Sequence, residues 1–141
     1  MTRPAPPVHV LVGLITDEAG RWLVNVRRAG THMAGRWEFP GGKRGPDETP
    51  FAALCRELDE ELGIEVLEAV PWLELVHDYA DKTVRLDVWR VGRYGGEVAA
   101  REGQALRWVT LDELSKLELL EADWPIVERL ARSPAVSRSR A

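Results

Sequence analysis

One segment, residues 42–64, constrains this chain more than any other; it reads GKRGPDETPFAALCRELDEELGI. Thr49 followed by Pro50 is typical of a helix N-cap and first helical position, where the missing N–H of proline has no intrahelical partner to lose. Gly63 stands where a residue in the left-handed conformation commonly ends a helix. The segment therefore predicts a helix that begins at Pro50 and ends before Gly63.

This helix has an apolar stripe and an acidic face. The apolar residues recur at helical spacing and predict the buried side: Phe51, Leu54, Cys55, Leu58 and Leu62. Glu57, Glu60 and Glu61 are spaced i, i+3 and i+4, so they share another face. Three carboxylates on one face repel one another unless cations neutralise them. Such a face is either solvated or binds a cation, and the loop before the helix favours the cation.

That loop reads Phe39-Pro40-Gly41-Gly42-Lys43. Consecutive glycines allow a backbone to approach phosphate or metal closely and to adopt angles that other residues avoid. The loop and the acidic helix together predict a phosphate- and metal-binding unit.

Residues 42–64 fit the signature G-x5-E-x7-R-E-U-x-E-E-x-G-U, where U is aliphatic, at every fixed position, and the chain thus resembles the Nudix family. The matching residues are Gly42, Glu48, Arg56, Glu57, Leu58, Glu60, Glu61, Gly63 and Ile64. The family hydrolyses nucleoside diphosphates linked to another group and uses a divalent metal, so the resemblance implies Mg2+, with Mn2+ as a substitute. It implies these metal ligands: the Gly41 carbonyl, Glu57, Glu60, Glu61 and, from a later loop, Glu102. It also implies that Arg56 orients the catalytic glutamates and that Glu48 holds Arg56.

Outside the signature, the chain from about Val8 to Leu130 resembles the MutT branch, which removes oxidised purine nucleotides such as 8-oxo-dGTP. The matches are Arg27-Arg28, His32-Met33, Glu38 to Lys43, Asp81-Lys82-x-Val84-x-Leu86 and Arg101 to Gln104. The resemblance implies five substrate-binding residues: Arg28, Phe39, Tyr79, Lys82 and Asp123. Arg28 follows Val24 and Val26 at period two, so we expect it to point the same way as those side chains. Lys82 is equally compatible with a solvated turn, and for Phe39 and Tyr79 the alternative is a place in the core. For Glu102 the alternative is an exposed loop, against which its Glu-Gly-Gln context argues.

Asp123 departs from the branch, which often has asparagine at this place. An asparagine amide both donates and accepts hydrogen bonds, whereas an ionised aspartate only accepts and a protonated one does both. Asp123 precedes Trp124-Pro125 and is therefore also a good candidate for a helix N-cap. Both interpretations stand at this point, and the preferred base stays open with them.

Length and charge bound the rest of the interpretation. At 141 residues with 45% apolar content, we expect one domain over residues 1–132 and a frayed tail over 133–141. The net charge is −4, so the chain lacks the excess of basic residues that is typical of proteins that bind nucleic-acid polymers. The N-terminus lacks the apolar core of a secretion signal and no 18-residue apolar run exists, so we expect a cytoplasmic protein with no membrane partner. For the oligomeric state we expect a monomer or a homodimer. Cys55 is the one cysteine, and we expect a buried thiol.

The remaining pattern predicts strands with two helices. We expect strands over residues 8–14, 22–28 (its hairpin partner), 37–39, 65–77 with an interruption at Pro71, 83–88 and 106–109. Thr110 to Glu113 matches a capping box, and a last helix is expected near residues 124–131. This order indicates an α/β protein with a mixed sheet between helical layers, which the resemblance refines to the Nudix α/β/α sandwich.

Three functions compete. The first is a nucleoside triphosphate pyrophosphohydrolase in which Glu57, or as second choice Glu102, takes a proton from water and the products are nucleoside monophosphate and pyrophosphate. The second is another Nudix substrate: a dinucleotide polyphosphate, a nucleotide sugar such as ADP-ribose, or a cytidine nucleotide such as CTP. The third is a non-catalytic nucleotide-binding module, against which the complete set of signature carboxylates argues.

Overall fold

The structure, a computed structural model, describes residues 6–31 and 33–133. Its strands are β1 (Val8–Leu14), β2 (Trp22–Val26), β3 (Trp37–Glu38), β4 (Gly41–Lys43), β5 (Glu65–Asp78), β6 (Thr83–Gly95) and β7 (Leu106–Val109). Its helices are α1 (Pro50–Leu62), α2 (Leu111–Leu114), the 3-10 turn η1 (Glu121–Asp123) and α3 (Trp124–Arg132). His32 and the expected tail beyond Ser133 lie outside the described residues.

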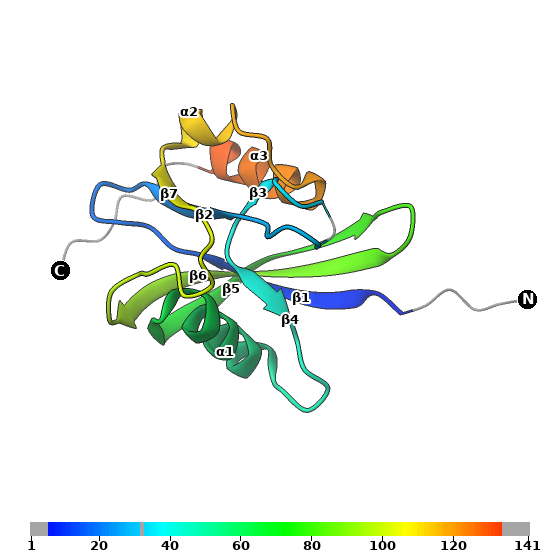
Figure 1. The fold of residues 1–141 in the computed structure, drawn as a ribbon, viewed down its shortest axis with the longest axis horizontal. Coiled ribbons are helices and arrows are strands. Elements are labelled where there is room, and N and C mark those ends of the chain that lie inside the picture. The colour runs from blue at the N-terminus through cyan, green and yellow to red at the C-terminus, as the bar shows by residue number, and fades with distance from the viewer. Residues whose placement is uncertain (1–5, 32, 134–141) are drawn as a thin grey trace, which may run out of the picture.

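Two sheets lie between two helical layers (Figure 1). One has the strand order β4-β1-β6-β5 and the other β3-β2-β7. β1 runs parallel to β6, while the other pairs are antiparallel, so the arrangement is mixed. Helix α1 covers one side, and α2 with α3 covers the other. The predicted α/β/α sandwich is confirmed, with its strands divided between two sheets.

β1 shows how the two cores form. Leu11 and Ile15 pack in a cluster with α1, while Val12 and Leu14 pack in a second cluster with α3. Alternate residues of a strand point to opposite faces, and here both faces are covered, which explains why the strand is apolar at nearly every position.

Helix α1 begins and ends where its sequence predicts. Thr49 has extended backbone angles and its hydroxyl accepts a hydrogen bond from the Ala52 N–H at 3.1 Å, while Gly63 closes the helix with a φ of 70°. The predicted apolar stripe is buried at Leu54, Leu58 and Leu62. Two of its members differ: Cys55 is only partly buried, and Phe51 is 39% exposed. Phe51 lies in the first turn, where its ring meets Trp89 at the rim of the core.

The expected hairpin between residues 8–14 and 22–28 is correct only at its turn. The Leu23 N–H bonds to the Ile15 carbonyl at 3.0 Å, and the Asp17 carboxylate accepts from the Ala19 and Arg21 N–H groups. Beyond this point the strands separate, because β1 is flanked by β4 and β6 while β2 is flanked by β3 and β7. The turn therefore links the two sheets rather than two neighbours in one sheet.

β5 runs through Pro71 without ending. The strand lies at the edge of its sheet and its register shifts between Pro71 and Leu73. An edge position tolerates proline because one row of N–H groups has no ladder partner. In the part of the chain that the structure describes, no helix is long and apolar enough to cross a membrane.

Candidate active site

The glycine loop and α1 meet at Gly42 and Glu57. An ideal Cβ added to Gly42 would lie 2.3 Å from the Glu57 carboxyl carbon, and one added to Gly41 would lie 1.9 Å from the Leu11 carbonyl oxygen. Gly41 also has a φ of 151°. These contacts leave no room for a side chain at either position, so the two glycines let β4 pass directly over the acidic face of α1.

Arg56 holds the acidic face in place. Its guanidinium donates to both Glu48 oxygens, at 2.6 and 2.8 Å, and to Glu57 Oε1 at 2.9 Å. It also reaches Glu60 at 3.3 Å and the Lys43 carbonyl at 3.0 Å. The hydrogen bond from Arg56 lowers the pKa of Glu48 to about 2. The sequence predicts this pairing of Arg56 with Glu48, and the structure contains it.

Gln104 links the segment that carries Glu61 to the segment that carries Glu102. Gln104 is buried; its amide donates to the Glu61 carbonyl at 3.0 Å and accepts from the Glu102 N–H at 3.0 Å. The Arg101 N–H bonds to the same Glu61 carbonyl at 3.1 Å. The loop that carries Glu102 is thus tied to the last turn of α1, and both glutamates line a cavity of about 130 Å³.

The electrostatics of these carboxylates favour a cation. Burial raises the pKa of Glu61 to about 9, with further rises from the charges of Glu38, Glu57 and Glu102, while a hydrogen bond from the Gly41 backbone opposes them. Burial also raises the pKa of Glu57 against the pull of Arg56. Oxygen donors of this kind suit Mg2+ and other hard divalent cations. Within residues 6–31 and 33–133, however, no three acidic, histidine or cysteine side chains stand ready as a ligand set. Arg56 bonds Glu57 through Oε1 alone, which leaves Oε2 of Glu57 for a metal ion, whereas Glu60 would have to turn away from Arg56.

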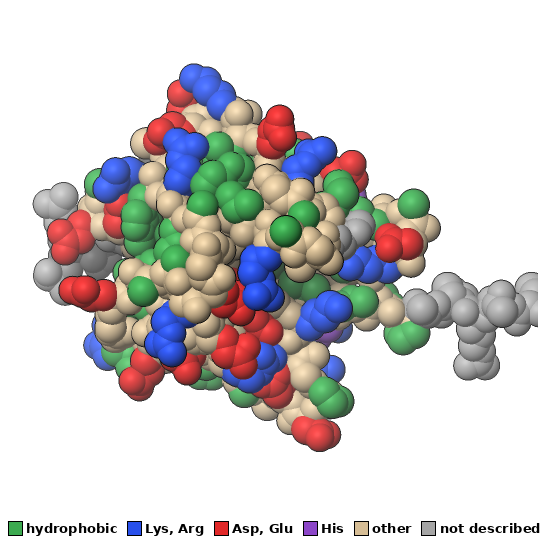
Figure 2. Space-filling view, in the orientation of Figure 1, with side chains coloured by type: hydrophobic (Ala, Val, Ile, Leu, Met, Phe, Trp, Pro, Cys, Tyr) green, Lys and Arg blue, Asp and Glu red, His purple; other side chains and the backbone are tan. Residues whose placement is uncertain are grey.

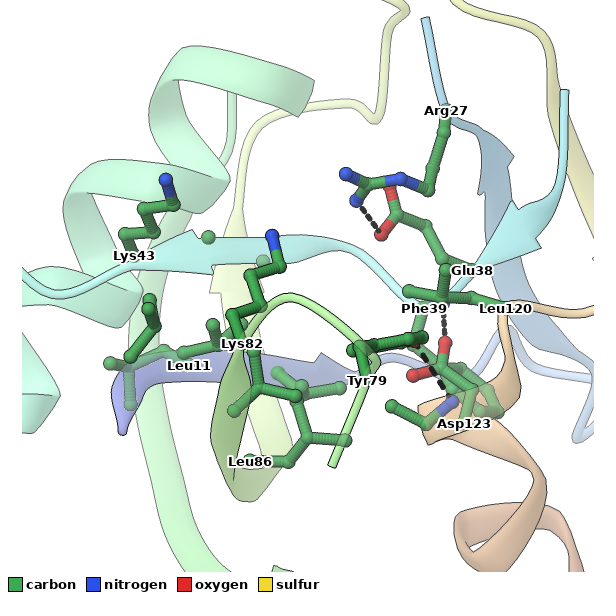
Figure 3. Close-up of a pocket in the computed structure, with 17 residues that line it drawn as sticks. Leu11, Arg27, Glu38, Phe39, Lys43, Tyr79, Lys82, Leu86, Leu120 and Asp123 are labelled. Atoms are coloured by element: carbon green, nitrogen blue, oxygen red, sulfur yellow. Dashed lines mark hydrogen bonds and ion pairs between the residues drawn. The ribbon is translucent and has the colours of Figure 1, made fainter. Parts of the chain in front are cut away.

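A second cavity, of about 210 Å³, adjoins this cluster (Figure 3). It is lined by Gly41 and by four of the predicted substrate-binding residues: Phe39, Tyr79, Lys82 and Asp123. Lys82 and Lys43 stand at one end of it and Asp123 at the other. The Tyr79 hydroxyl accepts a hydrogen bond from the Ala122 N–H at 3.2 Å, which joins the β5–β6 turn to η1. We call this cavity the nucleotide cleft.

Asp123 does not cap a helix. Its backbone is helical, with φ −86° and ψ −17°, and its side chain makes no capping bond. Instead the carboxylate, only 3% exposed, accepts a hydrogen bond from the Phe39 N–H at 3.0 Å. Burial raises the pKa of Asp123 to about 8, the charge of Glu38 adds to the rise, and the bond from Phe39 opposes it. The N-cap interpretation is therefore wrong, because the 3-10 turn before α3 directs this side chain into the cleft.

Arg27 and Glu38 line both the nucleotide cleft and the smaller cavity; both stand in segments that resemble the MutT branch, but neither was predicted to be a site residue. Arg27 Nη1 donates to Glu38 Oε1 at 2.9 Å. Burial raises the pKa of Glu38, opposed by Arg27. The available signal was the position of Glu38 directly before the glycine loop.

Arg28 lies beyond the end of β2 at Val26 and is exposed, whereas Val24 is buried. The alignment of Arg28 with Val24 and Val26 stays a prediction. Arg28 lines the smaller cavity together with Glu61 and Glu102. Figure 2 shows the resulting surface, where acidic and basic side chains gather side by side near α1.

Known proteins resemble this chain in sequence and in fold. Residues 11–129 match the family model described as NUDIX domain. The chain is 35% identical over 125 residues to the 8-oxo-dGTP diphosphatase of Escherichia coli, covering 89% of this chain and 97% of that protein. It is 37% identical over 118 residues to the CTP pyrophosphohydrolase of the same organism, covering 84% and 87%. The crystal structure of a MutT NUDIX hydrolase from Burkholderia pseudomallei superposes with a TM-score of 0.80 at 30% identity, covering 89% of this chain and 99% of that one.

The family match spans most of the chain, and each of these relatives is covered over nearly its whole length. The complete signature of α1 and its preceding loop agrees with the match, as does the sandwich that holds them. The chain belongs to the NUDIX domain family and is a Nudix hydrolase.

Proposed function

We propose that the chain hydrolyses a nucleoside triphosphate, with an oxidised purine such as that of 8-oxo-dGTP as the preferred base, to the monophosphate and pyrophosphate. One observation carries the proposal: the nucleotide cleft holds Asp123 and Phe39, and it shares Arg27 and Glu38 with the smaller cavity that Glu61 and Glu102 line. A base held at Asp123 places its phosphate chain over the carboxylate cluster. The 35% identity to an 8-oxo-dGTP diphosphatase supports the same assignment.

Nudix hydrolases generally need a divalent metal, and we propose Mg2+ here, with Mn2+ as a substitute. The residues that would hold it are the Gly41 carbonyl, Glu57, Glu60, Glu61 and Glu102. A bound divalent cation neutralises the triphosphate and polarises its P–O bonds. The raised pKa values of Glu57 and Glu61 support this set, because a cation relieves the repulsion that produces part of each rise.

The residues of the chain itself supply the base and the orientation. Glu57 takes a proton from the attacking water, with Glu102 as the second candidate. The water oxygen bonds to the β-phosphorus while the bond from that phosphorus to the oxygen that bridges the α- and β-phosphates breaks. Nucleoside monophosphate therefore leaves with this bridging oxygen. Arg56 fixes the Glu57 carboxylate through its 2.9 Å bond and is itself fixed by Glu48. Arg28, exposed at the mouth of the smaller cavity, contacts the phosphates.

Base recognition falls to Asp123, Phe39 and Tyr79. A pKa of about 8 keeps the buried Asp123 carboxyl mostly protonated at neutral pH. It can then donate one hydrogen bond as well as accept, as an asparagine amide does. The departure from asparagine is therefore compatible with an oxidised purine. Lys82, on the rim of the cleft, contacts the nucleotide at the phosphate end.

A second candidate is a cytidine triphosphate, favoured by the 37% identity to a CTP pyrophosphohydrolase. A panel of 8-oxo-dGTP, dGTP, CTP, ADP-ribose and diadenosine polyphosphates separates the candidates. Each is incubated with protein and Mg2+, and products are identified by chromatography. We expect the highest kcat/KM for 8-oxo-dGTP and pyrophosphate as product. A higher kcat/KM for CTP establishes the second candidate. If neither 8-oxo-dGTP nor CTP is hydrolysed, the proposal is contradicted.

A further inference from the structure

Asn25 is a polar residue at a buried strand position, where its side chain brings no evident gain in stability. It lies in the middle of β2, opposite Glu38 of β3 and Leu106 of β7, and is only 4% exposed. Its neighbours Leu23 and Val24 are fully buried. Asparagine is depleted in strands, and a buried amide without a partner loses the hydrogen bonds it makes with water in the unfolded chain. In the structure as described, Asn25 Nδ2 is a buried side-chain donor without a hydrogen-bond partner.

Asn25 lines the smaller cavity together with Glu61 and Glu102, with Arg28 and Thr31 also in its wall. Directly opposed residues in an antiparallel pair present their side chains on one face, so Asn25 lies beside Glu38. The Glu38 carboxylate, however, is engaged by Arg27 at 2.9 Å. The cavity, at about 130 Å³, has room for several water-sized groups. Asn25 therefore borders space that a ligand can occupy, while its unused Nδ2 donor is itself shielded from solvent.

Gln104 provides the comparison. It is the other buried amide in the wall of this cavity, and both ends of its side chain are bonded, to the Glu61 carbonyl and the Glu102 N–H. Gln104 therefore has a structural role, because its two hydrogen bonds hold the Glu102 loop against α1. Asn25 has the same functional group, a similar burial and no such bond through Nδ2.

We infer that Asn25 is a substrate-binding residue whose Nδ2, once the amide rotates toward the cavity, donates a hydrogen bond to a phosphate oxygen of the nucleotide. Phosphate oxygens accept and do not donate, so they match an unused N–H. Arg28 adds a positive charge to the same wall, which suits an anion, while Glu38, Glu61 and Glu102 in that wall require a divalent cation beside it. A neutral amide also recognises phosphate without adding a cation that would compete with metal for Glu61. The inference rests on the proposed function, since it takes a phosphate chain to enter this cavity.

The first experiment compares the melting temperatures of chelator-treated Asn25→Leu and Gln104→Met. Both substitutions replace an amide with an apolar group of similar size. Gln104→Met should lower the melting temperature because two bonds are lost. Asn25→Leu should leave it unchanged or raise it, because an unpaired donor is removed. A loss in Asn25→Leu as large as that in Gln104→Met would show that the amide serves the fold and would overturn the inference.

The second experiment measures binding of inorganic pyrophosphate in the presence of Mg2+ by calorimetry, and steady-state kinetics with the best nucleotide of the panel. Asn25→Leu should weaken pyrophosphate binding and lower kcat/KM, each by roughly tenfold, the usual effect of one neutral hydrogen bond. Binding of Mg2+ alone should not change. Asn25→Asp, which keeps the shape of the side chain and needs no repacking, should weaken pyrophosphate binding further because it repels the anion.

Pyrophosphate affinity and kcat/KM that match the wild type in both Asn25 variants overturn the inference, as does wild-type protein that binds no pyrophosphate. The two proposals fail separately. If the wild type hydrolyses no nucleotide, the proposed function fails, while the pyrophosphate titrations still decide the role of Asn25.

Discussion

The backbone N–H of Phe39 donates a hydrogen bond to a carboxylate oxygen of Asp123 at 3.0 Å, although 84 residues separate the two in the chain. The contact joins the start of the glycine loop to the turn before α3. It also places an ionisable group, buried and with a pKa of about 8, in the wall of the nucleotide cleft. The first two predictions follow from this contact.

If Asp123 reads the base, Asp123→Asn should change the ratio of kcat/KM between 8-oxo-dGTP and dGTP by roughly tenfold or more. The amide fixes which end donates, and a mismatched buried hydrogen bond costs about 1–3 kcal/mol. Asp123→Ala should shift the ratio as well, with a loss of melting temperature from the unpaired Phe39 N–H. A ratio that stays constant in both variants would exclude Asp123 from base recognition.

Stability should fall as pH rises from 5 to 8 in metal-free protein. The pKa of Asp123 is raised from its ordinary value of 3.8 to about 8 in the fold, so the folded protein binds this proton more tightly than the unfolded chain does. The stabilisation is complete below pH 3.8 and is lost as the pH passes through 8, at up to about 1.4 kcal/mol per pH unit for one proton. Urea unfolding of Asp123→Asn at pH values of about 5.5, 7 and 8.5 should give a flatter profile than the wild type. Equal slopes for the two proteins would contradict a raised pKa at this residue.

Glu57→Gln and Glu60→Gln should each lower kcat by at least roughly 100-fold, the range for loss of a general base or an essential ligand. The fold should persist because Arg56 keeps its two bonds to Glu48. Asp59→Asn is the matched control, since Asp59 lies on the same helix and is exposed. Near-normal turnover in a well-folded Glu57→Gln protein would remove Glu57 from the mechanism.

Gly42→Ala should reduce kcat by about 100-fold, because its Cβ would meet the Glu57 carboxylate at 2.3 Å and displace it, and small misplacements of reacting groups have effects of this size. Gly92→Ala is the control: its Cβ would have no neighbour closer than 3.8 Å. Both variants are assayed with the best substrate, and circular dichroism reports the fold. Equal activity of the two alanine variants would mean that the close approach of β4 to Glu57 has no role in turnover.

Millimolar Mg2+ should raise the melting temperature of chelator-treated protein, because a ligand that binds only the folded state stabilises it, by about 2.7 kcal/mol at roughly 100 times Kd. Sodium chloride at matched ionic strength controls for screening of the carboxylates. The shift should be smaller in Glu57→Gln. An identical shift with sodium chloride and with Mg2+ would speak against a specific metal site on α1.

The sequence by itself determined α1 and the acidic face that it presents. Thr49, Pro50 and Gly63 act within one turn of the helix ends, and the spacing of Glu57, Glu60 and Glu61 follows from helical geometry alone. The ion pair of Arg56 with Glu48 was also predictable through the family signature, because the two residues flank the same short segment. Interactions of this kind depend on neighbours in the chain, so a local pattern contains them.

Tertiary structure alone decided the rest of the site. β1 and β2 separate into two sheets because other strands occupy their edges, and no residue of the turn encodes that choice. Asp123 is excluded from capping because the packing of η1 aims it at Phe39 from a distant part of the chain. Arg27 is held by Glu38, from a strand that only the packed sheet brings beside it, and Asn25 Nδ2 is buried without a hydrogen-bond partner between strands on both sides. Burial and long-range partners set these orientations and pKa values, and they exist only once the sheets and helices have packed.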